Sequence, residues 1–495
     1  MTANFISTSF DVLVNEKMSH RIVMLTFLVF FTATNVRAGN YCGGNLLDTL
    51  RSMKPYLINE TAYRGFLTNA QCALNEDWLL QGKRLLVEQY HENAEIEAAD
   101  FDLLLRLMEK ERKLTYRTYF EDDCIPFTNH LINPDTGLRE LILYFNSKGL
   151  PRPIMAVAGY EGVRAVISLK TDQKILVEKT VAYFNHLSDR DTDLGKLKEL
   201  SADLYEIYLK PVEHYLQSGL FQHLTIVQDT ASQLIPFESL YDAENHEYVM
   251  QKPYSISYRP NLTHHASRHS LGVRRTAVIA YPSDDGLNQD NHQREADAIA
   301  ALAPGSVHLS GARFSTAGLL NRLNHSSHSI LHISSHAEFK SPFEQSMIRL
   351  DGGKAMRVAD LEKTIRSAAA RSAPLDLLIL SACQTARSHQ ADTPVNREQM
   401  IRASLGLAGA AARSGAKSVI ASLWNVIEAD RVLIDTGTMS TSIQGRDFHS
   451  LIQKNLDLTK AAALQQAKRN LMQDEYIRHR PHLWSVYILI GEPGK

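Results

Sequence analysis

Two short stretches of this sequence decide its fold: ILHISSHAEF at residues 330–339 and LLILSACQT at residues 377–385. Each begins with an apolar run of strand length and then turns polar. The second run scarcely alternates between apolar and polar residues, which is typical of a parallel strand buried on both faces. His336 follows the first predicted strand closely, and Cys383 follows the second.

The sequence around these stretches alternates between predicted strands and predicted helices. The strands fall at 276–280, 306–309, 330–334, 375–381, 417–423 and 485–490, and the helices at 293–303, 315–324, 359–370, 400–414 and 458–472. This alternation predicts βαβ units and a largely parallel sheet. We therefore predict an α/β fold with a mostly parallel sheet for the C-terminal part of the chain.

The N-terminal part divides into two further regions. Residues 139–271 contain predicted strands and one long predicted helix, 194–217. Residues 39–138 are predicted to be mostly helical. Apolar residues at 101, 104, 105 and 108 follow helical spacing, and Asp100 is the predicted N-cap. The sequence shows no internal repeat of 34 residues, so helical repeats are not predicted.

His336 and Cys383 are candidates for a catalytic pair. In a parallel sheet, ligands bind beyond the carboxyl ends of the strands, and one predicted helix separates the two strands that carry these residues. A thiol of pKa about 8.5 is mostly protonated at neutral pH, so it needs a base such as imidazole. The 47-residue separation (383 − 336) is similar to that of caspases. The backbone N–H groups of Ala337 and Cys383 are the predicted oxyanion donors.

A metal site is the alternative interpretation of the histidines. His325, His328, His332 and His336 are spaced by 3, 4 and 4 residues, which on a helix would resemble a set of zinc ligands. The run ILHIS has strand composition, however, and residues four apart in a strand are about 13 Å apart. We therefore predict no metal and no cofactor. A zinc hydrolase that uses these histidines is kept as an alternative hypothesis.

Composition and cysteine usage narrow the function classes. The formal net charge is −2 and no basic block is present, so nothing indicates a nucleic-acid partner. The four cysteines include no CxxC pair, which disfavours zinc-ribbon and thioredoxin-type sites. Cys42, Cys72 and Cys124 lie early in the chain and, in an oxidising compartment, would supply one disulfide of undetermined pairing.

The N-terminus has the layout of a secretory signal. An apolar run at 22–33 follows Arg21 and precedes VRA at 36–38, with small residues at the expected positions. The run is shorter than the about 20 residues that a membrane-spanning helix needs, so no stable membrane span is predicted. We expect a signal peptide over 1–38, with Met18 as an alternative start, and hence export to the periplasm or outside. If the run is instead a buried helix, the protein is cytoplasmic.

Together with further motifs, the two stretches resemble the CHAT domain, a relative of caspases and separase. The resemblance covers about residues 139–495 and rests on segments that occur in the family's order. These are IVQD (226–229) with LIPFESL (234–240), SISYRP (255–260), LHISSHAEF (331–339), LLILSACQT (377–385), GLA (406–408) with GAKSVIASLW (415–424), and HLWSVYILIG (482–491).

The resemblance implies a caspase-like α/β sandwich as the catalytic domain over 272–495, preceded by an inactive caspase-like subdomain over 139–271. It implies a cysteine endopeptidase acting on a protein or peptide, with Cys383 as nucleophile and His336 as base. The helices of 39–138 resemble a reduced form of the partner-binding arm that relatives carry, so a regulatory protein partner is expected there. The alternative is a catalytically weak scaffold that binds a peptide or protein partner.

Two departures from the family pattern affect this expectation. Ala337 stands where the family has Gly, and Ala cannot adopt a left-handed backbone as cheaply. Ile427 replaces the first of two acids, whereas Glu428 keeps the second. If an acid lines the substrate pocket, Glu428 is the candidate, with Asp430 behind it, and Arg or Lys would be preferred in the substrate. The alternative role of Glu428 is to complement a helix dipole.

Two further residues are candidates for substrate binding. Trp424 would wall the substrate groove or belong to the core. Asp229 would contact substrate or form a turn.

Overall fold

The computed structural model describes most of the chain from residue 98 onward. The described ranges are 98–120, 139–159, 162–229, 231–232, 235–262, 276–283, 289–325, 328–338, 346–371, 375–381, 415–424, 440–455 and 457–494, with a few positions between 80 and 88. The predicted signal segment 1–38 lies outside these residues. Cys383, Glu428 and Asp430 also lie outside them.

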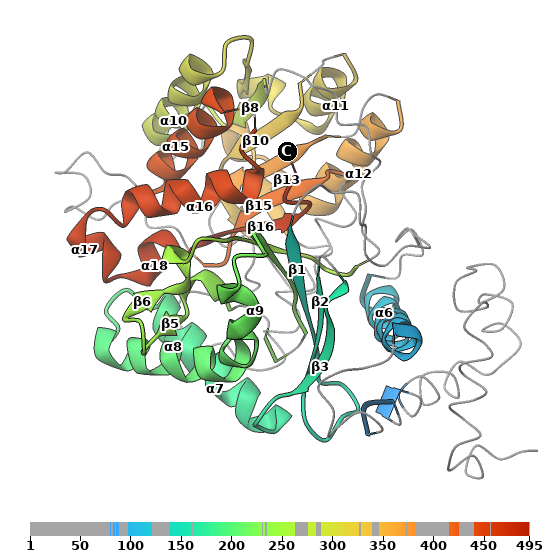
Figure 1. The fold of residues 1–495 in the computed structure, drawn as a ribbon. Helices are drawn as coiled ribbons and strands as arrows, with labels where there is room; N and C mark the ends of the chain where they lie inside the picture. The colour runs from blue at the N-terminus through green and yellow to red at the C-terminus, as the bar shows by residue number, and fades with distance from the viewer. Residues whose placement is uncertain are drawn as a thin grey trace, which may run out of the picture.

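A single twisted sheet runs through the middle of the described residues, with helices on both sides (Figure 1). In order across the sheet, its 11 strands are β3 (Arg164–Ser168), β2 (Ile154–Gly159), β1 (Glu140–Asn146), β4 (His223–Val227), β7 (Ser255–Tyr258), β16 (Tyr487–Gly491), β15 (Ser418–Ser422), β14 (Leu377–Ser381), β10 (Ile330–Ser334), β8 (Ala277–Tyr281) and β9 (Val307–Ser310). Most neighbouring pairs are parallel, and the predicted α/β sandwich is confirmed.

Four of the five helices predicted for the C-terminal part are present, and the fifth, 400–414, lies outside the described residues. In chain order, the helices are α6 (Ala98–Phe120), α7 (Gln173–Ser188), α8 (Leu194–Tyr208), α9 (Glu213–Gln217), α10 (Gln289–Leu302), α11 (Thr316–Asn324), α12 (Val358–Ala369), α15 (Ser440–Lys454), α16 (Lys460–Leu471), α17 (Glu475–Arg478) and α18 (Pro481–Trp484). Several begin at side-chain caps: Asp193, Ser315 and Thr459 accept hydrogen bonds from the first-turn N–H groups of α8, α11 and α16.

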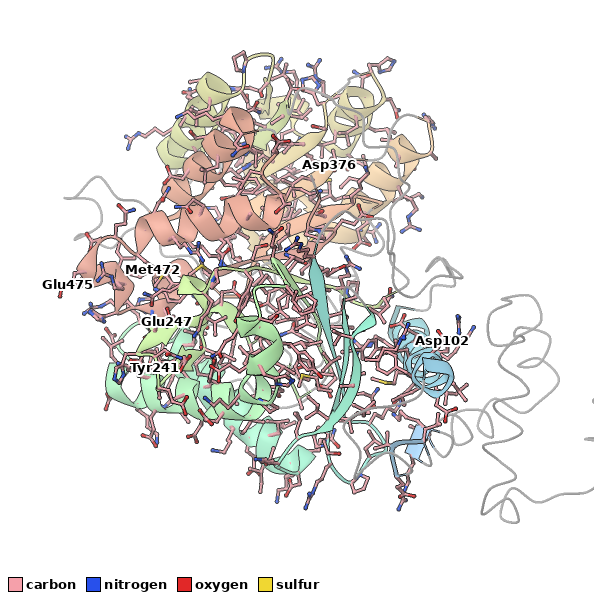
Figure 2. The ribbon with its side chains drawn as sticks, in the orientation of Figure 1. Asp102, Tyr241, Glu247, Asp376, Met472 and Glu475 are labelled. Carbon is pink, nitrogen blue, oxygen red and sulfur yellow. The ribbon has the colours of Figure 1, made fainter. Side chains whose placement is uncertain are left out.

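The two halves of the sheet belong to different parts of the sequence but form one layer. The last strand, β16, lies between β7 and β15, parallel to β7 and antiparallel to β15. An apolar cluster also joins the halves, because Tyr241 of strand β5 (Tyr241–Asp242) and Met472 after α16 both belong to it (Figure 2). The predicted boundary between the domains, at 271–272, falls between β7 and β8, outside the described residues.

The antiparallel pairing of β15 with β16 sets the direction of the two halves. Because β1, β4 and β7 run parallel to β16, they run opposite to β14 and β10. The carboxyl ends of β14 and β10 therefore lie at one edge of the sheet, and those of β1, β4 and β7 lie at the other.

Helix α6 packs across the strands of the N-terminal half (Figure 1). The guanidinium of Arg112 donates to the carbonyls of Phe145, Gln228 and Pro260, which lie at or just beyond the carboxyl ends of β1, β4 and β7. It also lies 4.7 Å from the ring centroid of Tyr144. The place where a parallel sheet would bind a ligand is thus occupied here by the chain's own helix.

Three local expectations differ from the structure. The helix predicted over 194–217 is broken into α8 and α9 around Pro211, whose missing N–H and ring disfavour a helix interior. Asp100 lies in the first turn of α6 and is not its N-cap. Helix α7, which was not predicted, is capped by Asp172.

No described helix is both long enough and apolar enough to span a bilayer.

Candidate active site

The two strands that carry the predicted dyad are hydrogen-bonded neighbours. Strands β10 and β14 are parallel, with Ile330 opposite Leu377 and Ser334 opposite Ser381. The Ser335 N–H continues the ladder by donating to the Ser381 carbonyl at 3.1 Å. In the sequence, His336 lies two residues after Ser334, and Cys383 lies two residues after Ser381. The predicted adjacency of these strands, with α12 between them in the chain, is present in the structure.

A small three-stranded sheet holds the segment of His336 in place. It consists of β11 (Ala337–Glu338), β12 (Met347–Arg349) and β13 (Ala355–Arg357). The Arg349 N–H donates to the His336 carbonyl at 2.8 Å, and the Ser335 hydroxyl donates to the Arg349 carbonyl at 2.7 Å. The turn after β12 is also anchored. Its Asp351 accepts a hydrogen bond at 2.8 Å from the N–H of Ser283, which lies just beyond β8.

Ala337 has the backbone geometry of a strand residue. It is paired with Ile348, and the hydrogen bond between Arg349 and His336 makes this a non-hydrogen-bonded pair. The N–H of Ala337 therefore points away from β12. Among the described non-glycine residues, only His246 has a positive φ, so Ala337 does not need the conformational freedom of Gly.

A buried polar cluster lies beneath the ends of β10 and β14, and the sequence analysis did not identify it. At its centre is Glu295 of α10, which is 6% exposed. Its carboxylate accepts from the Ser334 hydroxyl at 2.5 Å, the Ser381 hydroxyl at 3.0 Å and His332 Nε2 at 3.2 Å. On the far side of His332, Nδ1 lies 3.2 Å from Nε2 of His449 on α15.

The cluster extends to the candidate catalytic histidine. Nδ1 of His292, one turn before Glu295 on α10, lies 2.9 Å from the Ser334 hydroxyl. The His292 ring meets the His336 ring edge to face, with centroids 5.2 Å apart and planes at 81°. His292 is buried, whereas His336 is half-buried. The available signal in the sequence was a His and a Glu on one face of α10, together with a serine ending each of two apolar strands.

Charge in this cluster follows from burial and hydrogen bonding. Burial by itself raises the pKa of Glu295, but hydrogen bonds from His332, Ser334 and Ser381 and the charge of His332 outweigh it, so the net pKa is lowered. Burial lowers the pKa of His449 well below its ordinary value, with a further lowering by His332. Glu295 is therefore an ionised acceptor and His449 a neutral imidazole near pH 7.

Three of the four histidines that were considered as metal ligands have separate partners. Nδ1 of His325 contacts the Asn321 carbonyl, Nε2 of His328 contacts the Gly305 carbonyl, and His332 contacts Glu295. In the described part of the chain, no three His, Cys, Asp or Glu side chains are grouped to hold a metal ion.

The remaining described candidates lie away from His336 or in the core. Trp424 follows β15, is 4% exposed, donates its indole N–H to the His482 carbonyl at 3.2 Å and packs edge-on against Phe184. It therefore has the core role that was one of its two predicted roles. Asp229 follows β4, so it lies at the opposite edge of the sheet from His336. Its carboxylate accepts from the N–H groups of Ala231 and Ser232, the geometry of a turn residue.

Comparisons with known proteins establish the family. Residues 198–492, more than half of the chain, match the family model for the CHAT domain. The chain therefore belongs to the CHAT domain family, and the resemblance identified from its motifs is confirmed. The crystal structure of the arginine-specific cysteine proteinase gingipain R is similar, with 11% identity and a TM-score of 0.37 over 64% of this chain and 74% of that chain. Among curated protein sequences, none matches the chain.

Proposed function

We propose that the chain is a cysteine endopeptidase in which His336 and Cys383 form the catalytic dyad. The observation that carries the proposal is the register of β10 and β14. Ser334 is paired with Ser381, and each candidate follows its serine by two residues. Because both strands end at the same edge, the chain reaches the end of the sheet at paired positions, two residues before each candidate.

The proposed reaction uses ordinary thiol chemistry. His336 takes the proton of the Cys383 thiol, and the sulfur attacks the carbonyl carbon of the scissile peptide bond. The oxyanion accepts hydrogen bonds from the N–H groups of Ala337 and Cys383. The orientation of the Ala337 N–H, away from β12, is compatible with this role. His336 then protonates the leaving amine, and water hydrolyses the thioester to release the acid and restore the thiol.

We further propose that the substrate carries Arg or Lys before the cleaved bond. The support is an acidic residue, Glu428 or Asp430, shortly after the segment that ends at Trp424. A desolvated carboxylate in the pocket would bind a basic side chain and reject a neutral one. Trp424 and Asp229 are not part of this proposal, since Trp424 is buried and Asp229 lies at the other edge.

A panel of fluorogenic peptides tests the function. Peptides ending in Arg, Lys, Asp or Leu are incubated with the wild-type chain and with Cys383→Ala. We expect hydrolysis of the Arg or Lys peptides by the wild type, and loss of that hydrolysis in the variant. Inhibition by iodoacetamide but not by chelators separates the thiol mechanism from zinc hydrolysis. Wild-type activity no higher than that of Cys383→Ala on every peptide would refute the enzyme and favour the scaffold.

Specificity is tested separately. Glu428→Gln is expected to lower kcat/KM for Arg and Lys peptides by about tenfold or more, equivalent to about 1.4 kcal/mol. Asp430→Asn tests the second candidate acid in the same way, and the variant that loses the preference for basic substrates identifies the pocket residue. If both variants keep the wild-type ratio of basic to neutral substrates, the acidic pocket is excluded while the dyad is not.

A further inference from the structure

The hydroxyl groups of Ser334 and Ser381 converge on one carboxylate. Strands β10 and β14 are fully buried and, apart from His332, otherwise apolar, and these serines end them at paired positions. Both donate to Glu295, which comes from α10 and not from either strand. A buried carboxylate with several strong donors is a costly arrangement unless all of its partners stay in place.

The donors and acceptors of this cluster can be assigned one by one. An ionised carboxylate accepts only, so Ser334, Ser381 and His332 Nε2 are all donors to Glu295. The single hydroxyl proton of Ser334 is thereby used, and its oxygen accepts from His292 Nδ1–H. His332 Nδ1 lies 3.2 Å from His449 Nε2, and one of these two nitrogens carries the proton between them. The three donors to the carboxylate, Ser334, Ser381 and His332, thus come from β10 and β14.

Glu295 consequently stands at a branch point. One branch runs through Ser334 to the ring of His292 and then to the ring of His336, 5.2 Å away. A second branch ends on Ser381, whose carbonyl also accepts from the Ser335 N–H. A third runs through His332 to His449. A single carboxylate therefore ties the two strand ends together and orients the imidazole against which His336 packs.

We propose that Glu295 is a positioning residue that holds the carboxyl ends of β10 and β14 together and fixes the ring of His336. It touches neither substrate nor the reacting atoms. Cys383 follows Ser381 by two residues, so a change at the end of β14 should alter the reactivity of Cys383. This effect on Cys383 rests on the proposed function. Loss of the carboxylate frees the hydroxyl of Ser334, lets the His292 ring turn and loosens the pairing of Ser335 with Ser381.

The test compares Glu295→Gln with Glu238→Gln. Glu238 is as deeply buried, 3% exposed, and its carboxylate is bound by Lys468 and Tyr258 at the opposite edge of the sheet. Both variants replace a buried carboxylate by an amide of the same shape. The first readout is hydrogen exchange at the Ser335 amide, which requires no activity. We expect at least about tenfold faster exchange in Glu295→Gln and unchanged exchange in Glu238→Gln, whatever each does to global stability.

The second readout is the reactivity of Cys383. Its alkylation by iodoacetamide is followed by mass spectrometry of the Cys383 peptide from pH 6 to 9. An unassisted thiol titrates near 8.5, so Glu295→Gln should react about tenfold more slowly near pH 7 and normally at pH 9. On a cleaved peptide, kcat should fall by about 10- to 100-fold with KM changed less than about twofold. Glu295→Asp, which keeps the charge, should recover part of the loss.

The outcomes decide the proposal independently of the peptidase assignment. If the wild type hydrolyses no peptide, the proposed function fails, yet Ser335 exchange still tests the role of Glu295. Unchanged exchange and unchanged alkylation in Glu295→Gln overturn the positioning role. If Glu295→Gln does not fold, Ser334→Ala and Ser381→Ala, which remove the two strand-end donors to Glu295, replace it, and wild-type exchange and alkylation in both of them likewise overturn the proposal.

Discussion

Ser334 and Ser381 occupy paired positions at the ends of two parallel strands, and each precedes a member of the proposed dyad by two residues. Both hydroxyl groups donate to the carboxylate of Glu295. The relative level of His336 and the chain that carries Cys383 is therefore set by strand register and by a buried acid, and not by the loops alone. A register shift of one residue would turn one serine away from Glu295.

Ala337→Gly is expected to leave peptidase activity no higher than in the wild type. Ala337 is extended and paired with Ile348, so the family's Gly offers no conformational advantage at this backbone position. Glycine inside a strand should instead lower the free energy of unfolding by about 0.5–1 kcal/mol. Urea titration and kcat/KM on the best peptide measure both effects. A variant several-fold more active than the wild type would contradict this view of Ala337.

Arg112→Ala should detach α6 from the N-terminal half of the sheet. The guanidinium bonds three carbonyls at the ends of three strands, and hydrogen bonds from charged groups contribute about 1.5–3 kcal/mol each. Because the three bonds share one guanidinium, their contributions do not add independently. We expect the free energy of unfolding, measured in urea, to fall by about 3 kcal/mol, with faster amide exchange in α6. Arg84→Ala is the control, because the pair that Arg84 forms with Glu88 is exposed and worth at most about 0.5 kcal/mol. Similar losses in the two variants would argue against the anchor.

Gly491→Ala should destabilise the junction of β15 and β16. Gly491 has φ +104°, and a Cβ there would lie 2.4 Å from the Lys417 carbonyl oxygen. That oxygen accepts from the N–H of Glu492, so it is not free to move aside. Backbone strain and steric overlap together should lower the free energy of unfolding, measured in urea, by about 2–4 kcal/mol. Gly352→Ala, at φ +62° in open space, carries only the backbone cost of about 1–2 kcal/mol. Equal losses of stability in the two variants would show that the structure around position 491 relaxes to remove the overlap, contrary to this prediction.

The central strands were predictable because their signal is local. An apolar run that ends in polar residues identifies β10 and β14 from their own sequence, and one intervening helix indicates that they are neighbours. Helix α7 also has a local signal in the sequence, although it was not predicted. Its apolar residues follow helical spacing after the Asp172 cap: Leu176, Val177, Tyr183 and Phe184. The break at Pro211 likewise had a local signal.

The parts that the sequence could not indicate depend on distant pairing. Nothing local in YILIG places β16 between β7 and β15, and this pairing is what puts Asp229 at the opposite edge from His336. His292 and Glu295 lie on one face of α10, but this local pattern does not distinguish a buried acid from an exposed one. The partners of Glu295 come from β10 and β14, far away in the chain. A buried acid of this kind is visible only when the three elements are assembled.

Acidification should destabilise the N-terminal half of the sheet through His223. Its imidazole is fully buried between the hydroxyls of Ser255 and Ser257, at 2.8 and 2.9 Å, and burial lowers its pKa to about 4. In the unfolded chain an imidazole has a pKa of about 6.5. Below that pH the unfolded state binds a proton that the folded state excludes, so stability falls as the pH drops from about 6.5 to about 4 and is unaffected above this window.

The full effect of this one histidine is about 3 kcal/mol, and His223→Asn removes it. Asn retains a donor and an acceptor for the two serines but does not titrate. Free energies of unfolding in urea at pH 7 and pH 4 should therefore differ by about 3 kcal/mol more in the wild type than in His223→Asn. The same substitution at the exposed His325 controls for the loss of an imidazole as such. Parallel pH curves for wild type and His223→Asn would mean that His223 titrates normally in the folded protein.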